Sequence, residues 1–430
     1  MITIYKPTKE EWRGLTKRPI IATESLNESV STVLKQVKDR GDVAIQNYTS
    51  LFDGVQLTDF RVSEQEIKEA TELVSTEIKE AIAVAANNIK KFHQSQLKTE
   101  EKVETTAGVS CWRKSVGIEK VGLYIPGGTA PLFSTLLMLG IPAQLAGCKQ
   151  LVLCTPCNKE GKVNEVILYA AKYLGIDTIF KIGGAQAIAA MAYGTETVPQ
   201  VYKIFGPGNQ YVMKAKELVQ TQGVAIDMPA GPSEVLVIAD AQADADYIAA
   251  DLLSQAEHGT DSQVVFVTTS KQKIAEVSEA LDNQLKDLPR RDLAAQTLNN
   301  SLMIELPTLE DCIAFSNEYA PEHLILNIDN AELYIDQIIN AGSVFLGAYS
   351  CESAGDYASG TNHTLPTNGY AKSYSGVSVD SFVKKITFQK LTAQGLKNIG
   401  KTIEVMAEAE QLIAHKNAVS IRLKKMNDEQ

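Results

Sequence analysis

Histidine and cysteine are scarce in this chain, which has five histidines and six cysteines among 430 residues. Six cysteines are too few for a disulfide framework in a chain of this length. No apolar run approaches the roughly 18 residues that a membrane-spanning helix needs. Charged residues stand at positions 6, 9, 10 and 11, where a signal peptide would need a continuous apolar segment. These absences predict a cytoplasmic protein without membrane or disulfide chemistry.

Basic charge is also in short supply. Lysine and arginine together number 41 against 52 aspartates and glutamates, which gives a formal net charge of -11. Binding to nucleic-acid phosphates requires a basic surface, so this balance argues against a general nucleic-acid-binding role. A hydrophobic content of 44% with 22% charged residues is ordinary for a globular protein. Chemistry on a small molecule is the class that this composition favours.

The chain exceeds the roughly 250–300 residues at which single cores stop growing, so two or more domains are expected. From residue 121 onward, short apolar runs alternate with amphipathic helical segments, which is typical of βαβ units in parallel sheets. This pattern predicts an α/β fold with two doubly wound Rossmann-like domains, a helical N-terminal segment and a small C-terminal segment. The predicted strands are 121–125, 151–154, 178–182, 201–205 and 224–227 in the first sheet, and 235–239, 264–268, 301–306, 324–328 and 343–347 in the second.

A proline- and glycine-rich stretch at 229–232 marks the boundary between the two sets of strands. The first hundred residues are predicted to be helical, since apolar residues recur on one helical stripe and Ser63 and Glu66 form a capping-box pattern. We expect these helices to pack with the second sheet, and we expect a further helix over 403–415. The predicted division is 1–24 as an N-terminal segment, 25–120 with 232–375 as a discontinuous α/β domain, 121–231 as a second α/β domain and 376–430 as a small C-terminal domain.

Four of the five histidines lie in the C-terminal half beside amide or carboxylate residues. Gln255 and His258 end a predicted apolar helix at a spacing that places both side chains on one face of a turn. The pair suits a metal site, but it also suits an ordinary helix end in which His258 caps the last carbonyl groups before Gly259. The fifth histidine, His93, continues an apolar helical stripe, which predicts a packed side chain and not a ligand.

An acid and an imidazole, Glu322 and His323, stand directly before the apolar run 324–328. They suit general acid/base chemistry, because imidazole titrates near neutral pH and burial raises the pKa of a carboxyl group. Adjacent strand residues point to opposite sides, so a shared role would require irregular backbone. Exposed Glu-His pairs are common, and the pattern alone leaves both interpretations open.

The segment 350–366 follows a predicted strand and offers Asp356 and His363 among small polar residues, which makes it a candidate site loop or an inert polar loop. Near the C-terminus, Glu410 and His415 read alone as a plain helix terminus. A set of nitrogen and oxygen donors without thiolate suits a divalent cation such as zinc, with substrate filling open positions. That set consists of Gln255, His258, Asp356 and His415.

Glycine-rich turns follow three strands of the first set, at 126–128, 183–186 and 206–209. Backbone that approaches a phosphate closely before a helix N-terminus is how dinucleotides are bound. None of the turns has the G-x-G-x-x-G spacing, and strand-to-helix turns need glycine for geometric reasons alone. An aromatic face and two amides at these strand ends favour nucleotide binding. They belong to Tyr124, Gln186 and Asn209.

Cys154 and Cys157 form a C-x-x-C pair, a spacing that also occurs in redox and zinc motifs. The pair follows an apolar run and lacks both a second such pair and a nearby histidine. We therefore interpret it as the end of a strand.

Nine long segments closely resemble the histidinol dehydrogenase family, in that family's order. They read GLYIPGGTAPLFSTLLML, GGAQAIAAMAYGT, KIFGPGN, IDMPAGPSEVLVIAD, DLLSQAEHG, APEHLIL, AGSVFLG, ESAGDYASGTNHTLPT and AEAEQLIAHKNAVSIRL, and extend from about residue 121 to 423. The resemblance implies a zinc-dependent oxidoreductase that oxidises L-histidinol to L-histidine through bound histidinal with two NAD, the last step of histidine biosynthesis. It also implies one Zn²⁺ per subunit and an intertwined homodimer.

The resemblance also implies a role for each matching residue. Glu322 and His323 would be the acid/base pair. The metal ligands would be Gln255, His258, Asp356 and His415. Substrate contacts would fall on Ser233, Gln255, His258, Glu322, His323, Asp356, His363, Glu410 and His415, and NAD contacts on Tyr124, Gln186 and Asn209. The domain 121–231 would then bind NAD, the discontinuous domain would carry most metal and substrate residues, and 376–430 would contribute Glu410 and His415.

Within this mechanism, the alcohol loses hydride as its hydroxyl proton leaves, and the resemblance assigns that proton to His323. Glu322 would activate the water that hydrates the aldehyde. Two other classes remain open from the residues alone. A zinc hydrolase would use the same acid, imidazole and metal groups without needing the three glycine-rich turns. A metabolite-binding protein would bind without turnover.

Overall fold

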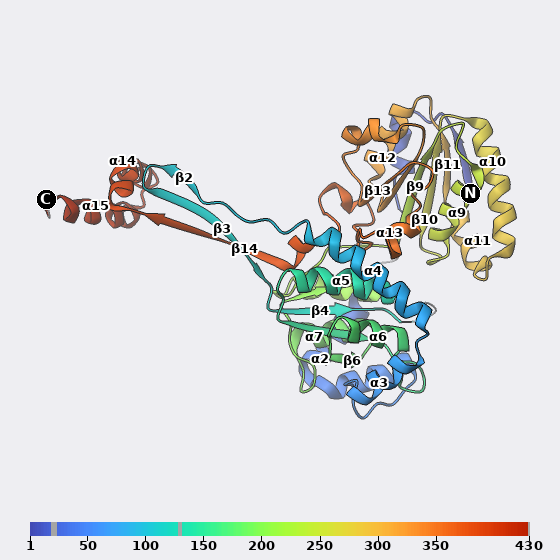
Figure 1. Ribbon diagram of the computed structural model, residues 1–430, viewed down its shortest axis with the longest axis horizontal. Coiled ribbons are helices and arrows are strands. Elements are labelled where there is room, and N and C mark those ends of the chain that lie inside the picture. The colour runs from blue at the N-terminus through green and yellow to red at the C-terminus, as the bar shows by residue number, and fades with distance from the viewer. Residues whose placement is uncertain (19–23, 128–130, 429–430) are drawn as a thin grey trace. The chain divides into compact units, whose positions relative to one another are not determined.

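The computed structural model describes residues 1–18, 24–127 and 131–428, and it divides into two compact units. The larger unit comprises Met1–Gln96 and Ile118–Ser381, and the smaller unit comprises Leu97–Gly117 and Phe382–Gln430. The larger unit contains two parallel sheets flanked by helices, which confirms the predicted fold class (Figure 1). In the described part of the chain, no helix is both long and apolar enough to cross a bilayer. Gly128 of the first glycine-rich turn lies outside the described residues.

The first sheet has five parallel strands in the order β6-β5-β4-β7-β8. Its central strand is β4, and the strand order reverses between β4 and β7. In open parallel sheets, such a reversal leaves a crevice at the carboxyl ends of the two strands, where nucleotides bind. The strands are β4 (Lys120–Tyr124), β5 (Gln150–Thr155), β6 (Ile179–Lys181), β7 (Lys203–Phe205) and β8 (Ala225–Ile226), and the connecting helices are α5 (Phe133–Leu145), α6 (Glu165–Tyr173), α7 (Gly184–Tyr193) and α8 (Gln210–Gln220).

The N-terminal helices pack on this first sheet's helices. Helix α2 (Glu24–Tyr48) lies on α7 and α8, α3 (Glu64–Leu73) on α6, and α4 (Thr76–Gln94) on α5. The buried stripe of α2, which includes Val30 and Val37, shares one core with Val152 and Phe180. The prediction that these helices pack with the second sheet is therefore wrong. A hydrophobic stripe says which face of a helix is buried, but not which sheet buries it. The short π-helix η1 (Thr49–Asp53) follows α2.

The second sheet has six parallel strands in the order β1-β11-β10-β9-β12-β13, with a reversal between β9 and β12. All ten strands predicted for the two sheets are present, with ends that differ by a few residues. The six strands are β1 (Ile2–Tyr5), β9 (Glu234–Ala239), β10 (Gln263–Thr268), β11 (Leu302–Glu305), β12 (His323–Asn327) and β13 (Ser343–Leu346). The helical segments are α1 (Lys9–Leu15), α9 (Ala245–Ala256), α10 (Lys271–Gln284), η2 (Leu285–Asp287), α11 (Arg291–Asn299), α12 (Leu309–Tyr319), η3 (Ala331–Gln337), α13 (Glu352–Tyr357), η4 (Tyr370–Lys372) and η5 (Val379–Phe382).

The first fifteen residues belong to the second sheet and not to a separate segment. Strand β1, which the sequence pattern did not reveal, pairs with β11 at the sheet edge. Helix α1 buries Trp12 edge-on against Phe315, with ring centroids 5.5 Å apart. A four-residue edge strand is too short to show a period-two pattern.

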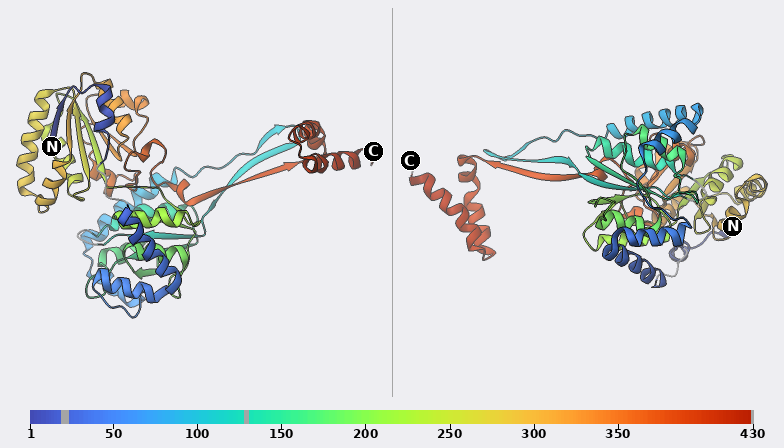
Figure 2. Two further views of the ribbon diagram at one scale, coloured as in Figure 1. Left: turned by 180° about the vertical axis from the view of Figure 1, so that it is seen from behind. Right: turned by 90° about the horizontal axis from the view of Figure 1, so that it is seen from below.

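The smaller unit is built around an antiparallel pair of nine-residue strands, β3 (Val109–Gly117) and β14 (Val383–Leu391) (Figure 2). Strand β2 (Val103–Thr106) completes the sheet, and helices α14 (Ala393–Ala409) and α15 (Ile413–Asp428) pack on each other. Residues 97–117 thus lie outside the domain predicted for them. The predicted helix over 403–415 is helical for most of its length but is not one helix, because Gln411 has φ +60°, a left-handed conformation that separates α14 from α15.

Candidate active site

Glu322 and His323 lie at the amino end of β12, next to the amino end of β9. Helix α12 ends at Tyr319. The φ of +54° at the next residue, Ala320, turns the chain so that Glu322 stands just outside the strand that His323 begins. Both residues are buried, with exposed fractions of 6% and 4%. His323 Nδ1 lies 3.6 Å from Glu322 Oε2. The left-handed turn provides the irregular backbone that a shared role requires.

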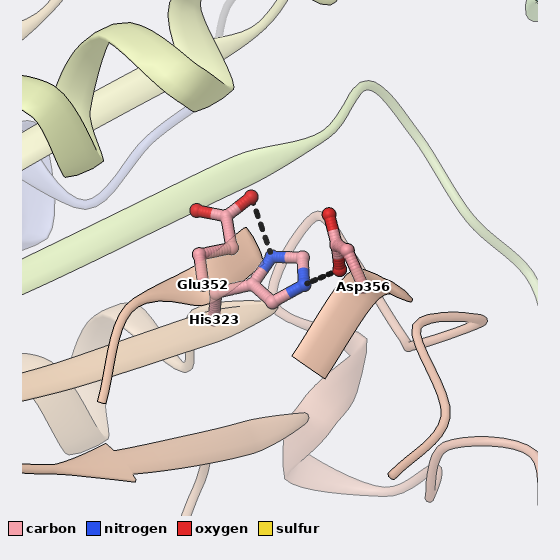
Figure 3. Close-up of side chains that lie close together, drawn as sticks. All are labelled: His323, Glu352 and Asp356. Atoms are coloured by element: carbon pink, nitrogen blue, oxygen red, sulfur yellow. Dashed lines mark ion pairs between the residues drawn. The ribbon is translucent and has the colours of Figure 1, made fainter. Parts of the chain in front are cut away.

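The short helix α13 presents two carboxylates to the same imidazole (Figure 3). His323 Nδ1 lies 3.8 Å from Glu352 Oε1, and Nε2 lies 3.5 Å from Asp356 Oδ1. The carbonyl oxygen of Glu234 also faces Nδ1, at 3.3 Å. Sequence reasoning included Asp356 but missed Glu352. Their spacing of four residues was the available signal, because residues four apart share one helix face.

His363 and Ser233 border the same region. The Nδ1 atom of His363 lies 2.9 Å from the Asp356 carbonyl oxygen, and its Nε2 atom lies 2.9 Å from the Thr135 hydroxyl on α5. Ser233 immediately precedes β9 and lines the same cavity as His363. The 350–366 segment is therefore not an inert surface loop, because the imidazole of His363 contacts both the main chain of Asp356 and the Thr135 side chain on α5.

The predicted pair Gln255 and His258 straddles the end of α9. The helix ends at Ala256, and the His258 amide still donates to the Gln255 carbonyl at 3.2 Å. His258 lines the cavity, whereas Gln255 is fully buried in the last turn. Neither amide atom of Gln255 has a hydrogen-bond partner among the described residues. An unpaired buried polar group costs about 1–3 kcal/mol, so this amide is poised for a ligand that the described residues do not supply.

Burial and mutual charge shift the pKa values of this cluster. Desolvation raises the pKa of Glu322 to about 8. Burial disfavours the His323 imidazolium, but Glu352, Glu322 and Asp356 outweigh it and raise the pKa of His323 well above its usual value. Burial would raise the pKa of Asp356, yet its contact with His323 lowers it. A perturbed acid and imidazole in one buried cluster indicate a catalytic site.

One cavity of about 1870 Å³ joins this cluster to the first sheet. It is lined by Glu322, His258 and His363 on one side and by Tyr124, Gln186 and Asn209 on the other. The latter three lie around the strand reversal at β4 and β7. The volume exceeds the roughly 300–1,000 Å³ of a pocket for one drug-sized ligand, so the cavity is large enough to hold more than one small molecule.

The three predicted cofactor residues differ in what already engages them. The Gly184 amide donates to the Tyr124 hydroxyl oxygen at 3.0 Å, and burial raises the pKa of Tyr124 to about 12. The Asn209 side chain caps α8 by accepting from two backbone amides. Gln186 is 1% exposed, and its amide atoms have no partner in the described part of the chain. Gln186 is therefore the group most available to a cofactor.

A buried ion pair holds the glycine-rich turn after β7. The side chains of Lys216 and Asp227 are each 1% exposed and pair with each other. Lys216 Nζ donates to the Gly206 carbonyl oxygen at 2.8 Å, and the Gly206 amide donates to Asp227 Oδ2 at 2.9 Å. Gly206 has φ +131°, and an added Cβ would lie 2.0 Å from the Tyr124 carbonyl oxygen. The pair thus positions a turn that admits only glycine.

Lys216→Met is expected to weaken binding of a dinucleotide in this cavity by about tenfold, or about 1.4 kcal/mol, because the Gly206 turn loses its support. It should also destabilise the fold by about 3–5 kcal/mol, since Asp227 is left as an unpaired buried carboxylate. Titration calorimetry with NAD and thermal unfolding measure the two effects. Lys214→Met, on the more exposed side of the same helix, is the matched control. Unchanged NAD affinity in folded Lys216→Met protein would show that the turn does not contact the cofactor.

The donor atoms present suit a divalent cation. One nitrogen of His323 and one carboxylate oxygen each of Glu352 and Asp356 lie within 4.8 Å of one another. Of these residues, only Asp356 was a predicted ligand. Gln255 has a buried amide oxygen without a partner among the described residues, and the charge of His258 contributes to the lowered pKa of Asp356. The remaining predicted ligand, His415, is exposed on α15 of the smaller unit, and Glu410 is exposed at the end of α14.

His93, Cys154 and Cys157 are not among the grouped metal-competent side chains of the described residues. His93 is fully buried in α4, with Nδ1 2.9 Å from the Ile89 carbonyl oxygen. Its Nε2 faces the Asn362 amide at 3.4 Å, so it packs against the residue before His363. Cys154 lies inside β5 and Cys157 just beyond it, and both are free thiols. The interpretation of the C-x-x-C pair as a strand end agrees with this placement.

Comparison with known proteins identifies the family of this chain. The histidinol dehydrogenase family model matches residues 16–423. The chain belongs to the histidinol dehydrogenase family. A histidinol dehydrogenase of Bacteroides thetaiotaomicron is 58% identical over 98% of this chain and 99% of its own length, and one of Escherichia coli K12 is 50% identical over 98% and 97%. The crystal structure of histidinol dehydrogenase from Elizabethkingia anophelis has a TM-score of 0.97 at 59% identity and covers 99% of both chains.

Members of this family are NAD-dependent oxidoreductases that catalyse the last step of histidine biosynthesis. The family therefore accounts for the two features that the cavity joins. One is a strand reversal suited to a dinucleotide, and the other is a buried acid/base cluster suited to substrate chemistry.

Proposed function

We propose that this chain oxidises L-histidinol to L-histidine through bound L-histidinal, with reduction of two NAD. The observation that carries the proposal is the single cavity that connects Gln186 and the β4–β7 reversal to Glu322 and His258. Hydride transfer requires the alcohol carbon and the nicotinamide to lie in contact, and a shared cavity permits this. Membership of the histidinol dehydrogenase family supports the choice of substrate.

His323 is proposed to take the hydroxyl proton in each oxidation. Three acceptors face its Nδ1 atom, namely the Glu234 carbonyl oxygen and the carboxylates of Glu322 and Glu352. In the neutral ring, the larger number of acceptors at Nδ1 favours the proton there, and Nε2, which lies 3.5 Å from Asp356 Oδ1, is the proposed basic nitrogen. Because alcohol and aldehyde hydrate each lose a hydroxyl proton as hydride leaves, the same nitrogen serves both steps.

Glu322 is proposed to activate the water that adds to histidinal. Its raised pKa places a carboxyl group near the working pH, where a general base is most effective. Addition of water gives the aldehyde hydrate, and loss of hydride to the second NAD then gives the carboxylic acid. The aldehyde must stay bound while NADH leaves and NAD enters, so the first product is the second substrate.

Substrate contacts are proposed for Ser233, Gln255, His258, Glu322, His323, Asp356, His363, Glu410 and His415, and NAD contacts for Tyr124, Gln186 and Asn209.

We propose one Zn²⁺ per subunit, held by Gln255, His258, Asp356 and His415. The unpartnered Gln255 amide and the absence of thiolate from the set support a cation that accepts nitrogen and oxygen ligands. When bound, the zinc ion supplies Lewis acidity and a fixed anchor for substrate nitrogens.

We also propose that the reaction takes place in the cytoplasm, because free thiols suit a reducing compartment.

We propose that two chains form an intertwined homodimer in which one chain's smaller unit completes its partner's site. His258→Asn and His415→Asn chains should each be inactive alone. Hybrid dimers made by co-refolding should regain one of two sites, because one site combines an intact His258 with an intact His415. The measurement is the specific activity of purified hybrids. If all ligands of a site come from one chain, both sites of the hybrid stay defective and no activity returns.

The direct test is incubation with L-histidinol and NAD, followed by identification of the product. L-Histidine and NADH should both accumulate. A zinc hydrolase built on the same residues would form no NADH, and a metabolite-binding protein would bind histidinol without consuming it. Either outcome would refute the proposed activity.

A further inference from the structure

A buried arginine from the N-terminal segment reaches the second sheet beside the acid/base pair. The side chain of Arg18 is 12% exposed and that of Glu234 is 2% exposed. Arg18 donates through Nε to Glu234 Oε2 at 2.7 Å and through Nη2 to Glu234 Oε1 at 3.0 Å. This two-pronged geometry fixes the carboxylate in both position and orientation.

Tyr319 also contacts the Glu234 carboxylate and the Arg18 guanidinium. The Arg18 guanidinium lies over the Tyr319 ring, 3.5 Å from its centre. The Tyr319 hydroxyl lies 3.1 Å from Glu234 Oε2 and 2.8 Å from Gln263 Oε1. Tyr319 is fully buried, so all four groups form one enclosed polar network.

The main chain of Glu234 contacts both members of the acid/base pair. Its amide donates to Glu322 Oε2 at 2.9 Å, and its carbonyl oxygen lies 3.3 Å from His323 Nδ1. Arg18 Nη2 also reaches the Ala320 carbonyl oxygen, at 3.5 Å, two residues before Glu322. The Arg18 guanidinium therefore contacts both segments that orient Glu322 and His323. These segments are the start of β9 and the turn before β12.

We propose that Arg18, Tyr319 and Glu234 are positioning residues that hold Glu322 and His323 in their reactive orientation. Buried ion pairs seldom stabilise a fold more than apolar packing of the same volume would, so stability is a weak reason for this network. Orientation is a stronger reason, since the network ends on the two main-chain groups that contact Glu322 and His323. The inference rests on the proposed function only in taking Glu322 and His323 as the reacting groups.

Arg18→Met tests the proposal, because methionine keeps much of the volume but donates no hydrogen bond. We expect kcat to fall about 100-fold, the loss that a displacement of about 1 Å can cause, in both oxidation steps. KM for histidinol and the bound metal content should stay within about threefold, since Arg18 touches neither. The matched control is Arg13→Met on the exposed face of α1, which should leave kcat unchanged.

Two milder variants keep the test decisive if Arg18→Met folds poorly. Arg18→Lys retains the positive charge but not the paired hydrogen bonds, and it should recover part of kcat. Tyr319→Phe removes only the hydroxyl and should lower kcat about tenfold in protein that stays folded, although the lost buried hydrogen bonds lower Tm. Wild-type kcat in all three folded variants, or a rise in KM at constant kcat, would overturn the positioning role. Failure of the wild-type protein to oxidise histidinol would instead overturn the proposed function, so the two failures are distinguishable.

Discussion

His323→Asn is expected to slow both oxidation steps by about 10²- to 10⁴-fold, the usual loss when a general base is removed. Glu322→Gln should slow oxidation of supplied histidinal by a similar factor while affecting oxidation of histidinol to the aldehyde much less. The difference arises because the alcohol step needs only a proton acceptor, whereas the aldehyde must first gain water. Single-turnover assays of each half-reaction measure the two rates separately.

The matched controls for these variants are Glu310→Gln, exposed on α12, and His93→Asn, outside the site. Both should retain wild-type rates in the two half-reactions. If Glu322→Gln slows the alcohol step as much as the aldehyde step, Glu322 does not act mainly by activating the water that adds to histidinal. If His323→Asn spares either step, another group is the base for that step.

Removal of the metal with a chelator is expected to abolish turnover while leaving most of the fold intact. Large apolar cores among the described residues of the larger unit do not include Gln255, His258 or Asp356, so their packing does not depend on the metal. Elemental analysis, circular dichroism and activity, measured on the same sample, separate the two effects. Readdition of zinc should restore the rate. Full activity in demonstrably metal-free protein would contradict the metal's role.

The variant form of the same prediction compares two histidines. His258→Asn should lower bound metal, because it removes a proposed nitrogen ligand. His93→Asn should leave bound metal unchanged, although it loses the buried contact with Ile89 and should lower Tm. Equal metal content in both variants would remove His258 from the ligand set.

Apart from β1, the strands of the two parallel sheets were predictable because each is a short apolar run bounded by polar or glycine residues. The packing partners of α2, α3 and α4 were not predictable, because an apolar stripe shows which face of a helix is buried but not which sheet that face packs against. Strands β3 and β14 were missed for another reason. Strand β14 is exposed along most of its length, so burial imposes no alternation on its sequence.

The residues of the candidate site were also predictable only in part. Glu322, His323 and Asp356 were found from residue type and the family motifs, and Glu352 could have been found from its helical spacing. The contribution of Glu234 could not, because it acts on the pair through its main-chain amide and carbonyl, which every residue type possesses. Arg18 is 216 residues away from its partner Glu234, and no local pattern indicates a contact at that separation.

The yield of NADH per L-histidinol consumed, determined with limiting histidinol and excess NAD, tests the proposed activity directly. We expect two NADH for each histidinol, with L-histidine as the product and no free histidinal in solution. One NADH with release of the aldehyde, or none, would contradict the proposed activity.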